Sequence, residues 1–476
     1  MPAPTDLARE SSTAAASVAD LVARARTAQA VADGYDQARV DELVAAAAWA
    51  ILQPSRNHAL AELAVRDTGI GNVPDKVLKN QRKTLGLLRD LHGRRTVGVI
   101  SDEAARGITE IARPVGVVCA ITPSTNPAAT PANKIINSLK ARNAVIVAPS
   151  PRGASTCARL IGYVHAEFER IGAPRDLVQM LPQPITKEAT AELMRCCDLV
   201  VATGSQANVR AAYTSGTPAF GVGAGNVAAI VDETADLDAA AAKIVMSKTF
   251  DNATSCSSEN SLVLLDAIAG PMLAALERQG CVRVDDADRE RLAATMWRDG
   301  KLSPAVIGQS VAVIAERANL QNHAARSARV LLVEHQGIGA GHPFSGEKLS
   351  PVLTVYRARD FQDAKRIVRA IYAFQGAGHS VSLHSALPER ALDLGLCLPV
   401  ARVIVNQVHC VANGGSFSNA LPVSLSMGCG TWGRNNFSDN LNVRHYMNVT
   451  RVVRPLPEHV PSVDELLGGY FARWGR

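Results

Sequence analysis

The sequence predicts an α/β protein built from parallel β-sheets with helices on both faces. Beyond Ile108, short runs of apolar and β-branched residues alternate with segments of helical periodicity, and short loops connect them. This alternation is the signature of a parallel, doubly wound sheet. With 476 residues, the chain exceeds the size at which one hydrophobic core stops growing, so we expect two or three domains.

The region before Ile108 is predicted to be helical. Apolar residues recur with helical spacing over 18–31, 40–52 and 59–65, and Pro54 suits the first turn of a helix. The next run, ITEIARPVGVVCAITP, predicts a hairpin strand followed by a buried strand. The chain therefore changes from helices to strands near residue 108.

Helices and strands alternate through the rest of the chain, in two units that meet near residue 226. The first unit is predicted to contain helix 132–142, strand AVIVAPS, helix 154–172, strand DLVVATGS and helix 206–213. The second is predicted to contain strand GNVAAIVD, helix DLDAAAAKIVMSKTF with Asp236 as its cap, and strands NSLVLLD, ARVLLVEH, PVLTVYRA and VIVNQVH. An exposed strand in HYMNVTRVVRP and the strands of 108–118 are candidates for an interface between subunits.

Composition and charge argue against several classes of protein. The chain carries 50 basic and 44 acidic residues, a net +6 spread along its length, and only 4% aromatics, so nucleic-acid binding is unsupported. The charged N-terminus is unlike a signal peptide, and the apolar run VAAAAWAIL is shorter than the about 20 residues of a membrane span. Nine cysteines without a CxxC pair favour a reduced, cytoplasmic protein without a metal site.

The stretch TFDNATSCSSENSLV places Cys256 among small polar residues, between a predicted helix and a predicted strand. Such a cysteine is either a packed thiol or a nucleophile at the mouth of a site. No Lys, Arg or His stands beside it in the sequence. Because a free thiol is only a few per cent thiolate near neutral pH, activation would have to come from tertiary neighbours or a cofactor.

Other segments offer groups that such a nucleophile needs. In ITPSTNPA, Asn126 follows a buried strand, where its amide can donate to a developing oxyanion, although asparagine is also a common turn residue. The block AFGVGAGN has the spacing GxGxG and no following helix, so it fails as a dinucleotide fingerprint and indicates a tight turn or a close backbone approach. In ATGSQANV, Gly204 and Ser205 end a strand and open a helix, which is the better phosphate site.

Together and in this order, these segments resemble the aldehyde dehydrogenase superfamily. More narrowly, they resemble its CoA-acylating branch, including the aldehyde dehydrogenase half of bifunctional alcohol/aldehyde dehydrogenases. The resemblance runs from DKVLKN (75–80) to HYMNVTRV (445–452), and the sequence ends soon after it, so we expect no alcohol dehydrogenase half. Its most specific blocks are ITPSTNPAATPANKIINSLKARNAVIVAPSPR, GVGAGN, MSKTFDNATSCSSENSLV, EKLSPVLTVYRA, GAGHS and LSMGCGTWGRNN.

The resemblance implies two doubly wound, Rossmann-like α/β domains and a small β oligomerisation arm. We expect a homodimer or homotetramer that binds a small aldehyde and CoA. The expected boundaries are 1–107 and 119–225 for the dinucleotide-binding domain, 226–435 for the catalytic domain, 108–118 and 436–455 for the oligomerisation strands, and 456–476 for a C-terminal tail.

The resemblance also assigns roles to residues. It makes Cys256 the nucleophile, which becomes a thioester, and it makes Asn126 and the backbone N–H of Cys256 the oxyanion hole. It places Glu347 at the nicotinamide ribose and His379, in GAGHS, where it can deprotonate the incoming CoA thiol. Outside these blocks each of the last two would more often be structural. The cofactor pyrophosphate is expected near Gly204 and Ser205, and Gly223 is expected among the cofactor-binding residues.

One departure from the hydrolytic members of the superfamily decides the second half of the reaction. Those members place a glutamate at the start of the glycine block, where it activates water, and Gly221 stands at that position here. Without this base, we expect the acyl group to pass to CoA, whose thiol is a stronger nucleophile than water. The alternative is a hydrolytic enzyme that takes its base from Glu259 or His379.

The cofactor and the substrate follow from further substitutions. Hydrolytic relatives place lysine and often glutamate in the segment that reads APSPR here; loss of the carboxylate, with Ser150 and Arg152 nearby, favours NADP, with NAD as the alternative. Arg434 stands where relatives usually have glycine, which suits an anionic aldehyde. The sequence most resembles acylating sulfoacetaldehyde dehydrogenases.

Several readings stay open at this point. Acetaldehyde, propionaldehyde and succinate semialdehyde are alternative substrates, and Arg434 would equally suit an acidic side chain or the phosphates of CoA. An inactive oligomeric scaffold of the same fold is an alternative of a different class. The presence of Cys256, Asn126 and Glu347 argues against such a scaffold.

Overall fold

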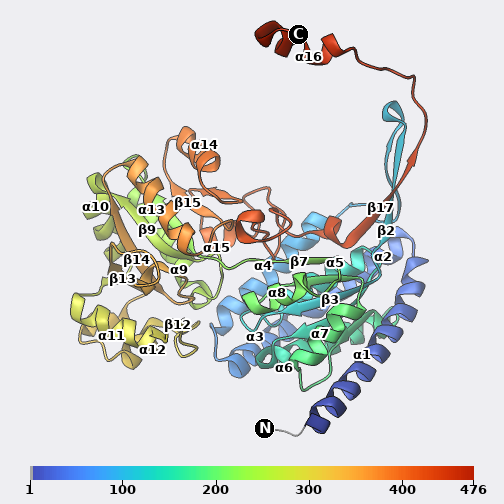
Figure 1. The fold of residues 1–476 in the computed structure, drawn as a ribbon. Helices are drawn as coiled ribbons and strands as arrows, with labels where there is room; N and C mark the ends of the chain where they lie inside the picture. The colour runs from blue at the N-terminus through green and yellow to red at the C-terminus, as the bar shows by residue number, and fades with distance from the viewer. Residues whose placement is uncertain (1–3) are drawn as a thin grey trace.

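The computed structural model describes residues 4–476, in which two parallel sheets are each covered by helices and a small antiparallel sheet projects from the body (Figure 1). The predicted α/β class is confirmed. Each parallel sheet has its own hydrophobic core, so the chain forms two main packing units. Among residues 4–476, no helix combines the length and the apolarity that a bilayer crossing requires.

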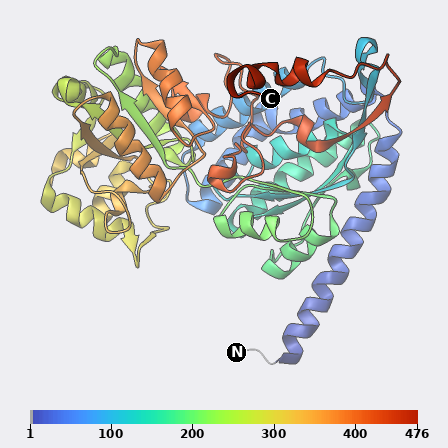
Figure 2. The same ribbon diagram turned by 45° about the horizontal axis from the view of Figure 1, so that its top comes forward.

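The region before the first strand is helical, as its periodicity predicts. Pro54 begins a helix, and the side chains of Asp36, Gln53 and Asn72 each accept a backbone N–H at a helix start. Figure 2 shows the first helix extending beyond the body of the molecule. The four helices are α1 (Pro4–Asp33), α2 (Gln37–Leu52), α3 (Pro54–Thr68) and α4 (Val73–Leu91).

The first parallel sheet has the strand order β5-β4-β3-β6-β7. From β3 the chain moves outward through β4 to β5 and then returns to the other side of β3 as β6. The connections on the two sides of β3 therefore leave in opposite directions, which opens a crevice outside the carboxyl ends of β3 and β6. The bounds are β3 (Val117–Thr122), β4 (Ala144–Pro149), β5 (Val178–Met180), β6 (Leu199–Ala202), β7 (Ala219–Gly221), α5 (Ala129–Lys140), α6 (Ala154–Arg170), α7 (Lys187–Cys196) and α8 (Gln206–Tyr213).

The second sheet is also parallel, with the order β10-β13-β14-β9-β8-β15-β16. Every strand predicted for this unit is present, and the side chain of Asp236 caps α9 by accepting the N–H of Ala239 at 3.0 Å. The strands are β8 (Val227–Val231), β9 (Glu259–Leu265), β10 (Cys281–Arg283), β13 (Val330–Glu334), β14 (Val352–Ala358), β15 (Val381–His384) and β16 (Val403–Val405).

The helices of the second unit cover both faces of this sheet (Figure 1). A smaller hydrophobic core lies under α11 and α12, beside a short hairpin. The helices are α9 (Leu237–Thr249), α10 (Asp266–Arg278), α11 (Asp286–Met296), α12 (Val311–Arg317), α13 (Phe361–Phe374), α14 (Pro388–Cys397) and α15 (His409–Ala412), and the hairpin consists of β11 (Trp297–Arg298) and β12 (Lys301–Leu302).

The third sheet is an antiparallel arm of β1 (Gly98–Glu103), β2 (Ile108–Pro114) and β17 (Met447–Val453), in the order β1-β2-β17. The last helix, α16 (Val463–Trp474), follows an extended segment and stands clear of both parallel sheets in Figure 1. None of its residues is buried. The chain therefore ends in an exposed helix that its own described residues do not cover.

The sheets differ from the expected boundaries in two places. Strand β1, which we expected in the dinucleotide-binding domain, pairs with β2 in the arm, because the bend at 104–107 folds it back along β2. Conversely, Leu441, Val443 and Tyr446, expected in the arm, are buried in the core of the first sheet. The arm strand from the C-terminal region begins only at Met447.

Candidate active site

Cys256 lies at the edge of the second sheet where strands begin. It occupies a turn between the 3₁₀ helix Phe250–Ala253 and β9, closed by a hydrogen bond from the N–H of Ser258 to the carbonyl of Ser255 at 2.9 Å. The amino ends of adjacent parallel strands meet at one edge, so the segments before β14, β9, β8 and β15 converge here. These segments carry Glu347, Cys256, the glycine block and His379.

The edge where strands end in the first sheet faces this turn. Asn126 follows β3, and it lines a cavity of about 760 Å³ together with Ser255 and Ser257, the two neighbours of Cys256. The amide oxygen of Asn126 accepts a hydrogen bond from Lys79 Nζ at 2.8 Å. The predicted nucleophile loop and the predicted oxyanion donor therefore share one cavity.

Close packing explains the glycines at 223 and 225 in the block AFGVGAGN. A Cβ at Gly225 would collide with the carbonyl oxygen of Cys256, so only glycine lets this backbone approach the cysteine turn. A Cβ at Gly223 would lie 3.2 Å from Cys429 Sγ. The expected close backbone approach is confirmed at Gly225.

The position of Gly221 differs from what we expected. A Cβ there would meet Val209 Cγ1 at 2.7 Å and Tyr213 Cε2 at 2.9 Å, so a side chain would run into α8 rather than toward Cys256. Gly221 is therefore poorly placed to stand for the missing glutamate. The expectation that the acyl group passes to CoA and not to water does not depend on Gly221, because no residue of the block AFGVGAGN carries a carboxyl group.

Burial and negative charge keep the Cys256 thiol protonated. Burial raises its pKa to about 12, and the carboxyl of Glu347 and the thiol of Cys429 add to this effect. Burial also raises the pKa of Glu347 to about 8. Neither Lys248 Nζ nor the Glu259 carboxyl, both buried nearby, has a hydrogen-bond partner among the described residues.

His379 is enclosed in the protein interior. Its Nδ1 lies 2.8 Å from Ser380 Oγ, which in turn lies 2.9 Å from His409 Nε2, and its Nε2 has no partner among residues 4–476. Burial, with a smaller effect from Arg402, lowers its pKa to about 3. In this conformation His379 is a neutral and weak base.

The residues expected at the cofactor lie where the strands of the first sheet end. Ser150 and Arg152 follow β4, while Gly204 and Ser205 stand between β6 and α8. Arg152 is exposed and makes no ion pair within the described chain. A Cβ on Gly204 would meet only Asn208 Nδ2, at 3.7 Å, so its backbone faces open space. An open strand edge beside a helix N-terminus and an unpaired arginine fits a phosphate-bearing cofactor.

The cavity also contains cations that sequence reasoning missed. Arg82 and Lys83 on α4 and Lys243 on α9 line it, whereas the predicted substrate residue Arg434 is exposed and does not. Lys83 donates to the carbonyls of Gly414 and Gly415 at 2.9 and 3.1 Å. No motif marked these residues, because they meet only around the cavity that α4, α9 and residues from 406–427 line together. Among the described residues, no group of three or more His, Cys, Asp or Glu side chains is placed to hold a metal ion.

Replacing Glu347 with glutamine is expected to lower the pKa of Cys256. The effect should appear above about pH 8, where Glu347 is ionised and opposes thiolate formation, and it should be small at pH 7. The measurement is the rate of Cys256 alkylation by iodoacetamide against pH, with exposed Glu316→Gln on α12 as the control. An unchanged profile in E347Q would remove Glu347 as an electrostatic neighbour of the thiol.

Comparison with known proteins agrees with this geometry. The aldehyde dehydrogenase family model matches residues 4–294. Sulfoacetaldehyde dehydrogenase (acylating) of Cupriavidus necator is 66% identical, covering 97% of this chain and 94% of its own. A protein of the same name from Bilophila wadsworthia is 42% identical over 96% of this chain and 99% of its own. An acetylating aldehyde dehydrogenase from Geobacillus thermoglucosidasius superposes with a TM-score of 0.91 at 33% identity, covering 95% of this chain and 99% of that chain.

Together, the two α/β domains and these relatives identify an oxidoreductase of the aldehyde dehydrogenase class. The chain belongs to the aldehyde dehydrogenase family. The resemblance to its acylating branch, seen from the sequence, is confirmed by these relatives.

Proposed function

We propose that this protein is a CoA-acylating dehydrogenase that oxidises sulfoacetaldehyde to sulfoacetyl-CoA. The observation that carries the proposal is the shared cavity of Asn126 and the Cys256 loop, next to a glycine block without any carboxyl group. The 66% identity to the acylating sulfoacetaldehyde dehydrogenase of Cupriavidus necator supports the substrate. An inactive scaffold would have no reason to keep this arrangement.

The first half of the reaction uses Cys256 and Asn126. Because the resting thiol of Cys256 is protonated, it first releases its proton to water, and the thiolate then attacks the aldehyde carbon. The carbonyl oxygen becomes an oxyanion that receives hydrogen bonds from the Asn126 amide and the Cys256 backbone N–H. When bound, the oxidised nicotinamide accepts the hydride that leaves this carbon. The acyl group then remains on Cys256 as a thioester.

The second half transfers the acyl group to CoA. The CoA sulfur attacks the thioester carbon, the bond to Cys256 Sγ breaks, and the cysteine leaves as a thiolate. His379 is the proposed acceptor of the CoA proton, although its enclosed position and low pKa require a change of surroundings when CoA binds. Glu259, buried with its pKa raised to about 7, is the second candidate.

We propose NADP as the preferred cofactor, with NAD as the alternative, since acylating aldehyde dehydrogenases use NAD(P) and CoA. Ser150 and Arg152 would hold the 2′-phosphate, because both are free to donate at the end of β4. Gly204 and Ser205 would lie at the pyrophosphate, with Gly223 and Glu347 toward the nicotinamide. We also propose that the β1–β2–β17 arm joins subunits into a homodimer or homotetramer.

The cations of the cavity support an anionic aldehyde. Arg82 and Lys243 line it and make no ion pair with another described residue, so they can receive a sulfonate or carboxylate. Arg434 lies outside this lining, which favours the α4 and α9 cations over the residue that the sequence suggested. The proposed substrate residues are therefore Arg82 and Lys243.

Lys243→Met and Arg82→Met are each expected to raise the KM for sulfoacetaldehyde about tenfold or more, because a charged hydrogen bond contributes about 1.5–3 kcal/mol. The KM for uncharged acetaldehyde should hardly change. Lys187→Met, at an exposed position at the start of α7, makes the same change in net charge away from the cavity. An equal rise in KM for both aldehydes would show that these cations do not bind the anionic group of the substrate.

The deciding experiment measures formation of reduced nicotinamide by the purified protein with sulfoacetaldehyde and NADP, with CoA added or withheld. Strict dependence on CoA is expected. Equal turnover without CoA would establish the hydrolytic alternative. Activity with acetaldehyde but not with sulfoacetaldehyde would keep the mechanism but discard the anionic substrate.

A further inference from the structure

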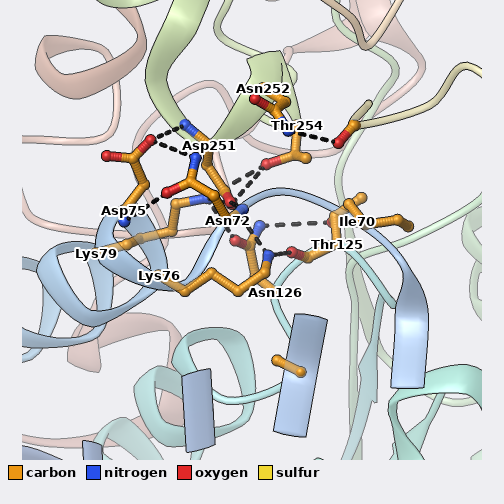
Figure 3. Close-up of polar contacts among 12 residues, drawn as sticks. Ile70, Asn72, Asp75, Lys76, Lys79, Thr125, Asn126, Asp251, Asn252 and Thr254 are labelled. Carbon is orange, nitrogen blue, oxygen red and sulfur yellow. Dashed lines mark hydrogen bonds and ion pairs between the residues drawn. The ribbon is translucent and has the colours of Figure 1, made fainter. Parts of the chain in front are cut away.

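The segment DKVLKN, at the start of the family resemblance, binds the backbone that leads to Cys256 through ion pairs and hydrogen bonds. It lies on α4 and belongs to the first unit, yet Lys76 Nζ and Lys79 Nζ reach Asp251 Oδ2 of the second unit at 3.1 and 2.5 Å (Figure 3). Asp75 Oδ2 accepts the backbone N–H of Asp251 at 2.8 Å. Both lysine side chains and the Asp251 carboxylate are almost completely buried.

Asp251 anchors a strained piece of backbone. Asp251, Asn252 and Ala253 adopt φ values of 50°, 53° and 58°, a left-handed conformation that costs roughly 1–2 kcal/mol for each residue other than glycine. The Asp251 carboxylate also accepts from Thr254 Oγ1 at 2.8 Å and from the N–H of Asn72 at 3.1 Å. Four donors on one buried carboxylate hold the turn that leads directly to Cys256.

Lys79 alone joins this anchor to the oxyanion donor. Its ammonium has three hydrogens and three acceptors, namely Asp251 Oδ2, Asn126 Oδ1 at 2.8 Å and Thr254 Oγ1 at 3.4 Å. Asp251 and Asn126 take two of these hydrogens at short distance, and the third has only the longer contact with Thr254 Oγ1. A direct contact with the reacting oxygen is therefore disfavoured.

The same contact decides which way the Asn126 amide faces. Because an ammonium group only donates, the side-chain oxygen of Asn126 must face Lys79, and the NH₂ group must face the other way. The closest acceptor for that NH₂ is Thr125 Oγ1, at 3.5 Å, too far for a good hydrogen bond. The NH₂ hydrogens thus remain available in the cavity that Asn126 shares with the cysteine loop.

We propose that Lys79 is a positioning residue that holds the Asn126 amide with its NH₂ group toward the oxyanion. Through its second contact, with Asp251, it also fixes the position of that amide relative to the cysteine loop. Lys79 lines the same cavity, but in this proposal it acts through Asn126 and not by contact with the reacting atoms. This inference rests on the proposed function, because it assigns the oxyanion to Asn126.

The chain offers a matched control for Lys79. Lys76 lies one turn earlier on α4 and contacts the same oxygen of Asp251, but its other contact is the carbonyl of Thr125 at 3.1 Å instead of Asn126. Lys76→Met therefore reports the effect of a weakened Asp251 anchor. Lys79→Met reports the same effect together with the loss of the contact that holds the Asn126 amide.

The test is a double-mutant cycle with Asn126→Ala, read as kcat and as the burst of reduced nicotinamide. We expect K79M to lower kcat roughly 30- to 100-fold with little change in the aldehyde KM, and K79M/N126A to be slower than N126A only by about the factor that K76M alone produces, since the rest of the Lys79 effect acts through the amide. K76M should have a smaller effect that multiplies with N126A. K79R should recover part of the loss, because it restores donors toward Asn126.

Alkylation of Cys256 by iodoacetamide separates this role from general damage, because that reaction forms no oxyanion. K79M should alkylate no more slowly than K76M, which weakens the same Asp251 anchor. A fall of alkylation as large as the fall of kcat, or full multiplication of the two kcat losses in K79M/N126A, would overturn the proposal. The wild-type enzyme assayed with and without CoA tests the proposed function separately.

Discussion

Replacing Cys256 with alanine is expected to abolish CoA-dependent formation of reduced nicotinamide, with a loss on the order of 10⁶-fold in kcat. The reason is chemical: without Sγ no thiohemiacetal forms, so no carbon is prepared to release a hydride, and nothing carries the acyl group to CoA. Cys410 also lines the cavity that contains Asn126, but it is buried on α15, whereas Cys256 stands between Ser255 and Ser257 in the turn that faces Asn126.

The covalent intermediate gives this prediction a direct measurement. With sulfoacetaldehyde and NADP but no CoA, intact-protein mass spectrometry should show one acyl group on the wild-type chain and none on C256A. Cys196→Ala, which removes a part-exposed thiol on α7, should keep both the adduct and the activity. An adduct that persists in C256A would place the nucleophile elsewhere.

Asn126→Ala is expected to lower kcat by about 10²–10³-fold, the usual effect of removing one oxyanion donor. The charge that Asn126 stabilises develops only after attack by Cys256, so the KM for the aldehyde should change far less than kcat. Burst kinetics of reduced nicotinamide should show the slow step before or at hydride transfer.

Ser124→Ala is the matched control for this variant, because Ser124 stands in the same loop after β3 and its hydroxyl makes no hydrogen bond within the described structure. It should retain activity. If N126A instead raised KM and left kcat unchanged, Asn126 would bind the ground-state aldehyde rather than the oxyanion.

The pattern of apolar residues was sufficient for most of the fold, because parallel strands buried on both faces read as continuous apolar runs. The helix predicted over 206–213 is α8, and the strands around Cys256 lie where the sequence places them. The arm was harder to delimit: β1 is too exposed to show an apolar run, and the buried stretch 441–446 looks no different from the strand after it.

The candidate site was predictable only where a single segment carries the chemistry. Cys256 and Asn126 each stand in a distinctive block, and so the sequence alone could propose them as partners, and the structure brings the cysteine turn and Asn126 to one cavity. Lys79 and Asp251 are 172 positions apart in the chain, and Arg82 and Lys243 meet only across a cavity, so no local pattern reveals them. The burial of His379 was equally invisible, because a histidine among small residues looks the same exposed or enclosed.

The anchor at Asp251 has a consequence for how the molecule loses activity. Lys76 and Lys79, which donate to its carboxylate, and Asp75, which accepts its N–H, lie on α4 of the first unit, while Asp251 itself belongs to the segment that carries the proposed nucleophile. The two units are therefore coupled at the catalytic loop, and separating them would release the strained turn even if each sheet stayed folded. Enzymatic activity therefore depends on the contact between the two domains, and it should be lost in one cooperative step when that contact breaks.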